Sequence, residues 1–246
     1  GVLSGVQASG QRALKQWSAS GYGKQLGFSA VGNAPGMQDF SGVFNIDQQG
    51  GTFRFLKSKP VLDWPVSLGK PIPSTLAGQL VWWKSGPDWV LAARDLNWQG
   101  AGLNIMLDSQ IQFYHSKNAP MLNLAARIAP FDFKTAKRFW LRNSMPDSSI
   151  RWLDMALVKG QIRDASIVMA GDLGRWPFTD KAGRFSARAT ILAEQFKFAA
   201  DWPEAQNAKL FTDFNGPGFT AIGTASFLGN PIELKTSGIE SFAKSD

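Results

Sequence analysis

The chain has 246 residues, which is enough to bury a substantial core in one large domain or two small ones. It has no cysteine, which excludes disulfides, thiolate metal sites and a cysteine nucleophile, and no apolar run of about 18 residues that would span a bilayer as a helix. The net charge of +7 permits nucleic acid, an anionic membrane surface or acidic headgroups as partners, although lysine and arginine are spread along the chain as on an ordinary solvated surface.

The N-terminal part is predicted to form short strands and one hairpin. Apolar pairs indicate strands at 6–8 and 26–28, with a helical turn at 12–17 between them. A hairpin is predicted at 40–55, because the Gly-rich turn at 47–51 joins two segments that carry phenylalanine at alternate positions.

Proline punctuates the next segment, from Pro60 to Pro73. Proline at this density bars a central strand, so we expect an edge segment or a crossing loop, and this segment is also the weak candidate for a domain boundary. Two strands at 79–83 and 89–94 follow, joined by a turn at 85–88, and alternating residues then indicate further strands over 103–107 and 122–128.

Two short helices are predicted next. Asp132 is placed to cap a helix from Phe133 to Leu141, and a second helix is expected after Pro146. In that second helix Ile150, Leu153 and Leu157 fall on one side, and Gly160 stands where a left-handed C-cap would end it.

The clearest alternation lies in the last third, at 185–191 and 219–227. About a dozen short strands therefore stand against two or three short helices, which predicts a mainly β fold. Hairpins of similar design recur without a strict period, as in an elongated sheet that grows by adding strands. Because the chain begins at Gly1 without an initiator methionine, we expect residues 1–246 to be a single fragment of a longer protein.

No constellation of residues supports an enzyme. His115 is the only histidine, so a multi-histidine zinc site is impossible and a serine–histidine–aspartate triad would have to use this residue. The carboxylates are scattered and mostly sit at turns, and no phosphate-binding loop or dinucleotide fingerprint is present. We therefore expect no catalytic residues, no metal and no cofactor.

The alternating apolar residues have two interpretations. They form either the packed interior of a sandwich or barrel, or the open apolar face of one curved sheet that holds hydrocarbon. The mixture of large Phe with small Ala and Gly leaves lateral room, and so few helices cannot cover so much sheet, which favours the open face. The candidates for this face are Phe53, Phe55, Leu103, Ile105, Leu107, Phe185, Ala187, Ala189, Ile191, Phe219, Ala221, Ala225 and Phe227.

The densest motifs run from Arg151 to Pro203, and their order resembles the central conserved region of the YhdP family, large AsmA-like proteins of the Gram-negative envelope. Upstream motifs in the same order extend the resemblance over residues 20 to 235, although Trp176 stands where the family pattern suggests Phe. The motif residues, to which we assign packing roles, are Trp152, Leu153, Leu157, Gly160, Gly171, Asp172, Trp176, Pro177, Phe178, Trp202 and Pro203.

The resemblance implies an elongated, taco-like antiparallel β-groove in the periplasm, belonging to a protein anchored in the inner membrane. It also implies non-enzymatic transport of phospholipids or other acyl-chain lipids between the inner and outer membranes, in support of the outer-membrane permeability barrier. Expected partners are these lipids, neighbouring groove segments of the same chain, and both membranes through parts of the chain not present here.

Two alternatives remain open from the sequence. The first is a structural or protein-binding β-scaffold of the envelope with a packed core and no lipid, whose sheet edges pair with neighbours by strand addition. The second is a single-strand nucleic-acid binder, since tryptophan and phenylalanine beside basic residues can stack bases. The aromatic signatures of RNA-binding motifs are absent, so nucleic acid is not expected.

Overall fold

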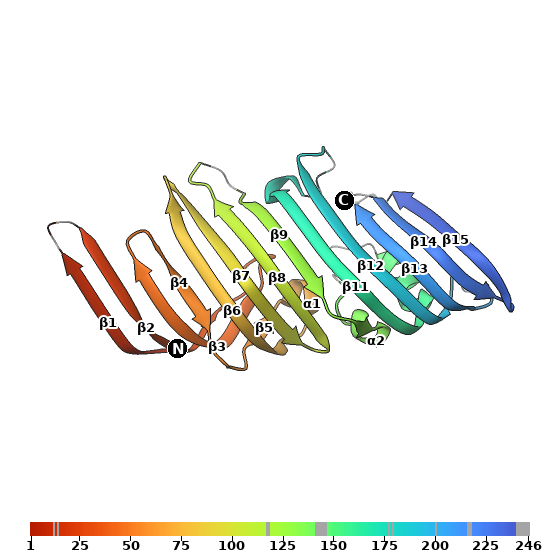
Figure 1. Cartoon of the computed structure of the whole chain (residues 1–246), viewed down its shortest axis with the longest axis horizontal. Coiled ribbons are helices and arrows are strands. Elements are labelled where there is room, and N and C mark those ends of the chain that lie inside the picture. Colours follow the sequence, from red (N-terminus) through yellow and green to blue (C-terminus); the bar gives the residue numbers. More distant parts are fainter. Residues whose placement is uncertain are drawn as a thin grey trace. The chain divides into compact units, whose positions relative to one another are not determined.

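The computed structural model describes residues 1–11, 13, 15–116, 119–140, 147–176, 178, 180–199, 201–215 and 218–239. These residues form two compact units. The first unit comprises residues 1–126 and 170–174, and the second comprises residues 127–169 and 175–246. Strands dominate both units, as Figure 1 shows.

The first unit is built on an antiparallel sheet in which successive strands are neighbours. The order is β1-β2-β3-β4-β6-β7-β8-β9, and the short β5 pairs with both β3 and β6 beside this path. The elements are β1 (Val2–Gln11), β2 (Gln16–Phe28), β3 (Gly36–Asp47), β4 (Gly50–Phe55), β5 (Val61–Asp63), α1 (Pro65–Leu68), β6 (Ile72–Ser85), β7 (Asp88–Gly100), β8 (Leu103–Phe113) and β9 (Met121–Ile128), the last of which ends in the second unit.

The turn signals of the sequence account for these pairings. The predicted hairpin at 40–55 is β3 and β4, with Gln49 and Gly50 both donating backbone N–H groups to Asp47 Oδ1 in the turn. The proline-rich segment forms β5 and α1. Because β5 is paired on both sides, with β3 and β6, the expected edge segment is wrong. The helical turn predicted to reach Trp17 is wrong at its end, because β2 already begins at Gln16 and pairs with β1.

The second unit also carries an antiparallel sheet, ordered β12-β13-β14-β15, with β10 paired to β11. β14 and β15 are joined by the two-residue turn Leu228–Gly229, which favours antiparallel neighbours. The elements are β10 (Phe131–Asp132), α2 (Phe133–Ala136), α3 (Asp147–Ala156), β11 (Leu157–Asp172), the 3₁₀ turn η2 (Leu173–Arg175), β12 (Gly183–Phe196), β13 (Ala205–Asn215), β14 (Gly218–Phe227) and β15 (Asn230–Ile239); the last residues of β11 and the first two of η2 belong to the first unit.

Asp132 caps α2 as predicted, since its Oδ1 accepts the Thr135 N–H at 2.7 Å. The helix is nevertheless only one turn long, where the sequence predicted a helix through Leu141, a residue outside the described part of the chain. The last described residues before it, 137–140, form a turn and an irregular segment.

The predicted C-cap role of Gly160 is wrong. α3 ends at Ala156, Leu157 is the first residue of β11, and Gly160 lies inside that strand with φ +150°. A Cβ at Gly160 would stand 2.2 Å from the Leu192 carbonyl oxygen of β12. Gly160 is therefore required by the close approach of two strands and not by a helix end.

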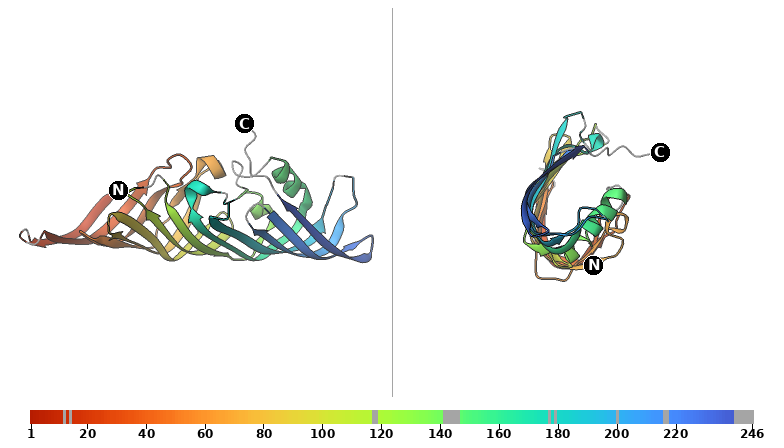
Figure 2. Two further views of the ribbon diagram at one scale, coloured as in Figure 1. Left: turned by 90° about the horizontal axis from the view of Figure 1, so that it is seen from above. Right: turned by 90° about the vertical axis from the view of Figure 1, so that its right-hand side faces the viewer.

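The strands of each unit bend along their length (Figure 2). Irregular pairing contributes to the bend in β7, where the register with β8 shifts between Ala93 and Leu96. At this bulge Asp95 has a φ of +47° and donates its N–H to Asp108 Oδ1 at 2.9 Å. Bulges of this kind increase local twist and bend the strand. The predicted class, a curved, mainly β antiparallel fold with a few short helices, is confirmed.

Candidate functional site

One face of the first unit's sheet collects apolar side chains in register. Residues paired directly across antiparallel strands point to the same face. One such row crosses six strands from β2 to β8, and its members are Gly21, Phe44, Phe53, Leu80, Ala93 and Ser109. The row places four apolar side chains, from β3, β4, β6 and β7, side by side on this face.

Strand β8 extends this face with the three predicted residues. Leu103, Ile105 and Leu107 lie opposite Gly100, Trp98 and Leu96 of β7. Leu103 is buried, whereas Ile105 and Leu107 are only half-buried. The predicted parity of this strand therefore agrees with its register, and part of its apolar face is open to solvent.

Phenylalanine rings gather at one end of the same face. Phe40, Phe53 and Phe55 make edge-to-face contacts with centroid distances of 5.2 to 5.9 Å, and Phe28 adds a fourth ring at 6.1 Å from Phe40. Edge-to-face pairs stabilise such clusters beyond their area burial. The predicted candidates Phe53 and Phe55 are thus buried mainly by other rings of the chain.

The opposite face of this sheet is mixed. One row runs through Tyr22, Val43, Arg54, Gln79 and Arg94, and both arginines are exposed. Val90 and Ala92 of β7 lie on the same face as Arg94 and are buried. An apolar face is buried against something or stays available to an apolar ligand.

The second unit also carries apolar rows on one face of its sheet. Three rows cross β12, β13 and β14 on one face, and they bring together predicted residues from strands far apart in the sequence. The rows are Ala187–Phe214–Phe219, Ala189–Thr212–Ala221 and Ile191–Leu210–Gly223. Ala225 pairs with Ile232 of β15, and Phe227 packs against the same apolar cluster as Ile191.

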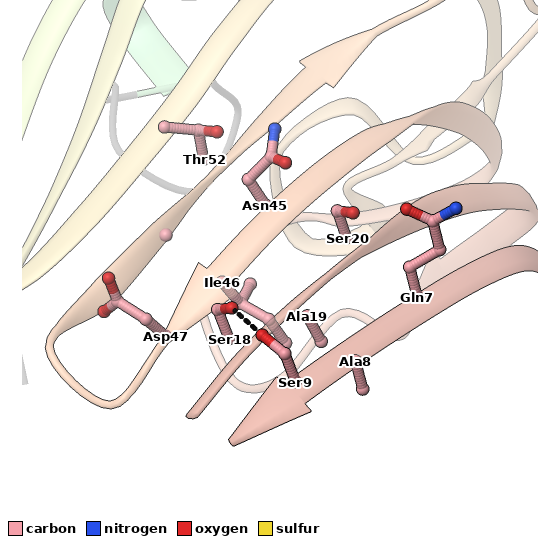
Figure 3. Close-up of a pocket in the computed structure, with 11 residues that line it drawn as sticks. Gln7, Ala8, Ser9, Ser18, Ala19, Ser20, Asn45, Ile46, Asp47 and Thr52 are labelled. Carbon is pink, nitrogen blue, oxygen red and sulfur yellow. Dashed lines mark hydrogen bonds between the residues drawn. The ribbon is translucent and has the colours of Figure 1, made fainter. Parts of the chain in front are cut away.

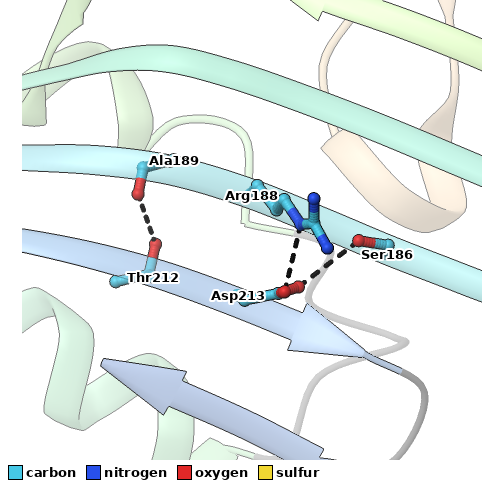
Figure 4. Close-up of polar contacts among 5 residues, drawn as sticks. All are labelled: Ser186, Arg188, Ala189, Thr212 and Asp213. Atoms are coloured by element: carbon cyan, nitrogen blue, oxygen red, sulfur yellow. Dashed lines mark hydrogen bonds and ion pairs between the residues drawn. The ribbon is translucent and has the colours of Figure 1, made fainter. Parts of the chain in front are cut away.

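Polar groups on these strands are satisfied locally, as Figure 4 shows. The Thr212 hydroxyl, which lies in the apolar row, donates to the Ala189 carbonyl oxygen at 3.0 Å. On the other face Arg188 Nε donates to Asp213 Oδ2 at 3.0 Å, and the Ser186 hydroxyl lies 3.3 Å from Asp213 Oδ1. The charged pair thus lies on the other face, and none of the row members named above is charged.

Helices α2 and α3 cover part of this face in the second unit. The buried cluster contains Phe133 of α2, Ala156 at the end of α3, and Leu157 at the start of β11. Its sheet members come from β12, β13 and β14 and are mostly small: Ala193, Phe196, Ala205, Ala208, Leu210 and Ala225. The apolar floor of the second unit is thus partly occupied by the chain's own helices.

A hollow of about 680 Å³ lies elsewhere, on β1 to β4 of the first unit. Its side chains are mostly polar (Figure 3), and Ser9 and Ser18 are hydrogen-bonded to each other at 3.0 Å. No predicted site residue lines it; the lining residues are Gln7, Ala8, Ser9, Ser18, Ala19, Ser20, Asn45, Ile46, Asp47, Gly51 and Thr52.

The motif tryptophans contact phenylalanine rings but stay partly exposed. Trp152 is 39% exposed beside Phe196, Trp176 is 41% exposed between Phe178 and Phe185, and Trp202 is 57% exposed at 6.2 Å from Phe227. None of the three is a core residue, so each could meet a ligand as well as support the fold.

The remaining motif residues have structural positions. Leu153 packs against the cluster and Phe178 is buried, whereas Pro203 is exposed ahead of β13. Gly171 and Asp172 end β11, where Asp172 Oδ1 accepts the Gly174 N–H at 2.9 Å, as expected of a turn aspartate. Pro177 lies outside the described residues.

Nothing in the described ranges resembles a metal centre: no three His, Cys, Asp or Glu side chains are placed to hold an ion. His115 is exposed in a turn after β8, and its backbone N–H donates to Asp88 Oδ1 at 3.0 Å. In the same part of the chain, no helix has the length and apolarity needed to cross a membrane.

Strand β13 was missed by sequence reasoning. Ala208, Leu210 and Thr212 alternate toward the apolar face, but the register with β14 shifts between Gln206 and Lys209. Asn207 has a φ of +52° at this irregularity, and Phe211 is 49% exposed on the other face. An apolar residue of the wrong parity beside a bulge conceals the period, although the alternation from 208 to 212 was a usable signal.

Comparison with known proteins identifies the family. The sequence model described as YhdP protein matches residues 1–240, nearly the whole chain. The chain belongs to the YhdP family. The chain is similar to a curated protein, the intermembrane phospholipid transporter YhdP of Escherichia coli (strain K12), with 26% identity over 103 residues. No solved structure matches the chain.

The match to that relative is partial on both sides. It covers 42% of this chain and 8% of the transporter from Escherichia coli. The matched part of the chain thus corresponds to a small section of a much longer relative, and the expected resemblance to the YhdP family is confirmed.

Proposed function

We propose that this chain is a section of an intermembrane phospholipid transporter of the Gram-negative envelope, and that its apolar sheet faces carry acyl chains across the periplasm. The observation that supports the proposal is the register. In each unit, alternate residues of successive strands form largely apolar rows on one face, and the row described in the first unit crosses six strands. Family membership gives this face its proposed ligand.

The physical mechanism is burial without catalysis. Each buried methylene contributes about 0.8 kcal/mol, so a tail of roughly 16 carbons is held by on the order of 10 kcal/mol. If neighbouring rows offer similar burial, a tail moves along the face with little change in free energy, whereas escape into water costs the whole amount. The charged headgroup stays in water, where exposed Lys and Arg hold its phosphate as point charges.

The proposed lipid-facing residues are those predicted from the sequence. Half-buried members such as Ile105, Ala189 and Ile191 are the best contacts, because side chains that are already sealed offer no surface to a tail. Transport, location in the periplasm and connection to both membranes belong to the longer protein, as the partial match to the Escherichia coli transporter suggests.

Lipid retention tests the proposal. The purified chain is extracted with organic solvent and the extract is analysed by mass spectrometry, with a protein of similar size purified from the same cells as the control. We expect phospholipid in amounts stoichiometric with the chain. Protein free of amphiphile, which also fails to crosslink a phospholipid with a photoactivatable tail, would favour the envelope scaffold instead.

A further inference from the structure

The apolar cluster of the second unit has two kinds of members. Ala193, Leu210 and Ala225 come from the sheet face whose rows contain the proposed lipid contacts. The α3 side consists of Ala156, which is a buried member of the cluster, and Leu153, which packs against it. Ile150 of the same helix is also buried, at 4% exposure. The helix therefore covers surface that an acyl chain would need under the proposed function, on which this inference rests.

Polar contacts hold α3 at its outer side. Trp152 Nε1 donates to the Phe198 carbonyl oxygen at 3.0 Å, and Trp140 Nε1 donates to Asp154 Oδ1 at 2.9 Å. Lys137 Nζ also donates to the Asp154 carbonyl oxygen at 2.6 Å. All three bonds lie at part-buried or exposed positions, where water can replace either partner when the helix leaves.

Helix α3 is joined to the sheet at its C-terminal end, and α2 is attached to the sheet separately. At its C-terminal end α3 runs into β11 without a loop, and the Ala156 carbonyl oxygen accepts the Lys197 N–H at 3.0 Å. Helix α2 is tethered independently, because β10, which directly precedes it, pairs with β11 through Phe131 and Ile162. A movement about Leu157 can therefore lift Ile150 and Leu153 while α2 and the strands keep their pairing.

We propose that α3 occupies an acyl-chain site in the second unit and is displaced from it by the hydrocarbon tail of an amphiphile. The floor residues Ala193, Ala205 and Ala208 are small, so moving the helix away leaves room on the floor for an unbranched tail. The tail and the helix cannot occupy the floor together. Each therefore weakens the binding of the other by the same factor, as linkage requires.

Thiol labelling tests the displacement, because the chain has no cysteine of its own. Ile150→Cys places a single thiol at a buried position of α3, 4% exposed, and Val90→Cys places a control thiol at a position of similar burial, 3% exposed, in the first unit. Each variant is titrated with palmitoyl lysophosphatidylglycerol below its micelle concentration, and the rate of maleimide labelling is measured. We expect saturable acceleration of at least about fivefold at position 150 and none at position 90.

A second pair of variants tests the competition. Trp140→Phe with Trp152→Phe removes both indole N–H donors while keeping aromatic rings in place. Trp17→Phe with Trp89→Phe is the matched control, since both of these tryptophans are exposed in the first unit. Loss of two hydrogen bonds that hold α3 is expected to lower the lysolipid concentration at half-saturation about threefold to tenfold in the first pair only.

The outcomes distinguish failure of the α3 displacement from failure of the proposed transport function. Faster maleimide labelling at position 150, together with tighter lysolipid binding by the Trp140→Phe, Trp152→Phe variant, supports displacement of α3. Lysolipid that binds and crosslinks to the chain while both labelling rates stay constant overturns the displacement of α3 and leaves the transport proposal standing. A chain that binds no lysolipid in any variant, with native circular dichroism, overturns both.

Discussion

Asp132 determines where α2 begins. Hydrogen bonds from the Thr135 side chain and backbone N–H lower the pKa of its carboxyl group, so the ionised form is favoured by folding. The cap sits directly before Phe133, which is 2% exposed in the apolar cluster. A single surface carboxylate thus fixes the position of a buried ring.

We expect Asp132→Ala to lower the free energy of unfolding by about 1 kcal/mol at pH 7, because the first turn loses its cap. A depressed folded-state pKa contributes stability above the unfolded value, and that contribution is lost as the pH falls through the folded value. The difference between variant and wild type, measured by urea denaturation, should therefore shrink in acid. Asp132→Asn is the control, and a loss as large as that of alanine would contradict capping.

Gly160 lies where β11 closely approaches the backbone of Leu192 and Ala193 in β12. Gly160→Ala is expected to cost roughly 1–3 kcal/mol, because its Cβ would meet the Leu192 carbonyl oxygen and the backbone of Ala193 in addition to the unfavourable φ. Gly229→Ala is the matched control, since Gly229 also has a positive φ but its Cβ would meet nothing within 4 Å. Equal losses in thermal unfolding of the two variants would exclude the close approach as the cause.

At the scale of the strand, function depends on which face a residue occupies. Ala189 lies in an apolar row with Thr212 and Ala221, whereas Thr190 lies on the other face with Phe211 and Ile222. Both positions are half-buried on the same strand. They therefore form a matched pair for testing the proposed lipid path.

We expect Ala189→Arg to reduce crosslinking of a phospholipid with a photoactivatable tail at least about tenfold, because a guanidinium group placed on the apolar face obstructs the tail and resists dehydration. Thr190→Arg should crosslink as the wild type does. Circular dichroism and urea denaturation confirm that both variants fold. Normal crosslinking in folded Ala189→Arg would count against this face as the path.

At the scale of the whole chain, stability is unevenly distributed within each unit. Every residue of β1 is exposed, whereas β7 in the same unit contains Val90 and Ala92 with 3% and 1% exposure. In the second unit, the last strand β15 has no buried residue among those described from 230 to 237. Outer strands should therefore open locally while inner strands open only with their unit.

Amide hydrogen exchange measures this gradient. We expect the amides of β1 to exchange roughly a hundredfold faster than those of β7, and those of β15 faster than those of β12. The comparison within one unit is the control for solution conditions and intrinsic rates. Protection of β1 equal to that of β7 in the purified chain would mean that β1 is covered by another copy or by a ligand.

The sequence by itself determined the class and the faces. Two-residue alternation at 185–191 and 219–227 predicted strands and grouped their apolar residues, because successive side chains of a strand point to opposite sides. The turn at 85–88 and the cap at Asp132 were likewise local, since each depends on neighbouring residues. The family was identifiable from the order of its motifs.

Only the tertiary structure decided the contacts between residues that are distant in the sequence. Gly160 could not be distinguished from a C-cap, because its requirement comes from Leu192 on another strand. The bulge at Asn207 concealed the parity of β13, and the packing of Leu153 against a cluster that contains Ala193 and Ala208 joins segments about 40 to 55 residues apart. Such contacts depend on register and close packing, and neither is encoded in any single stretch of the chain.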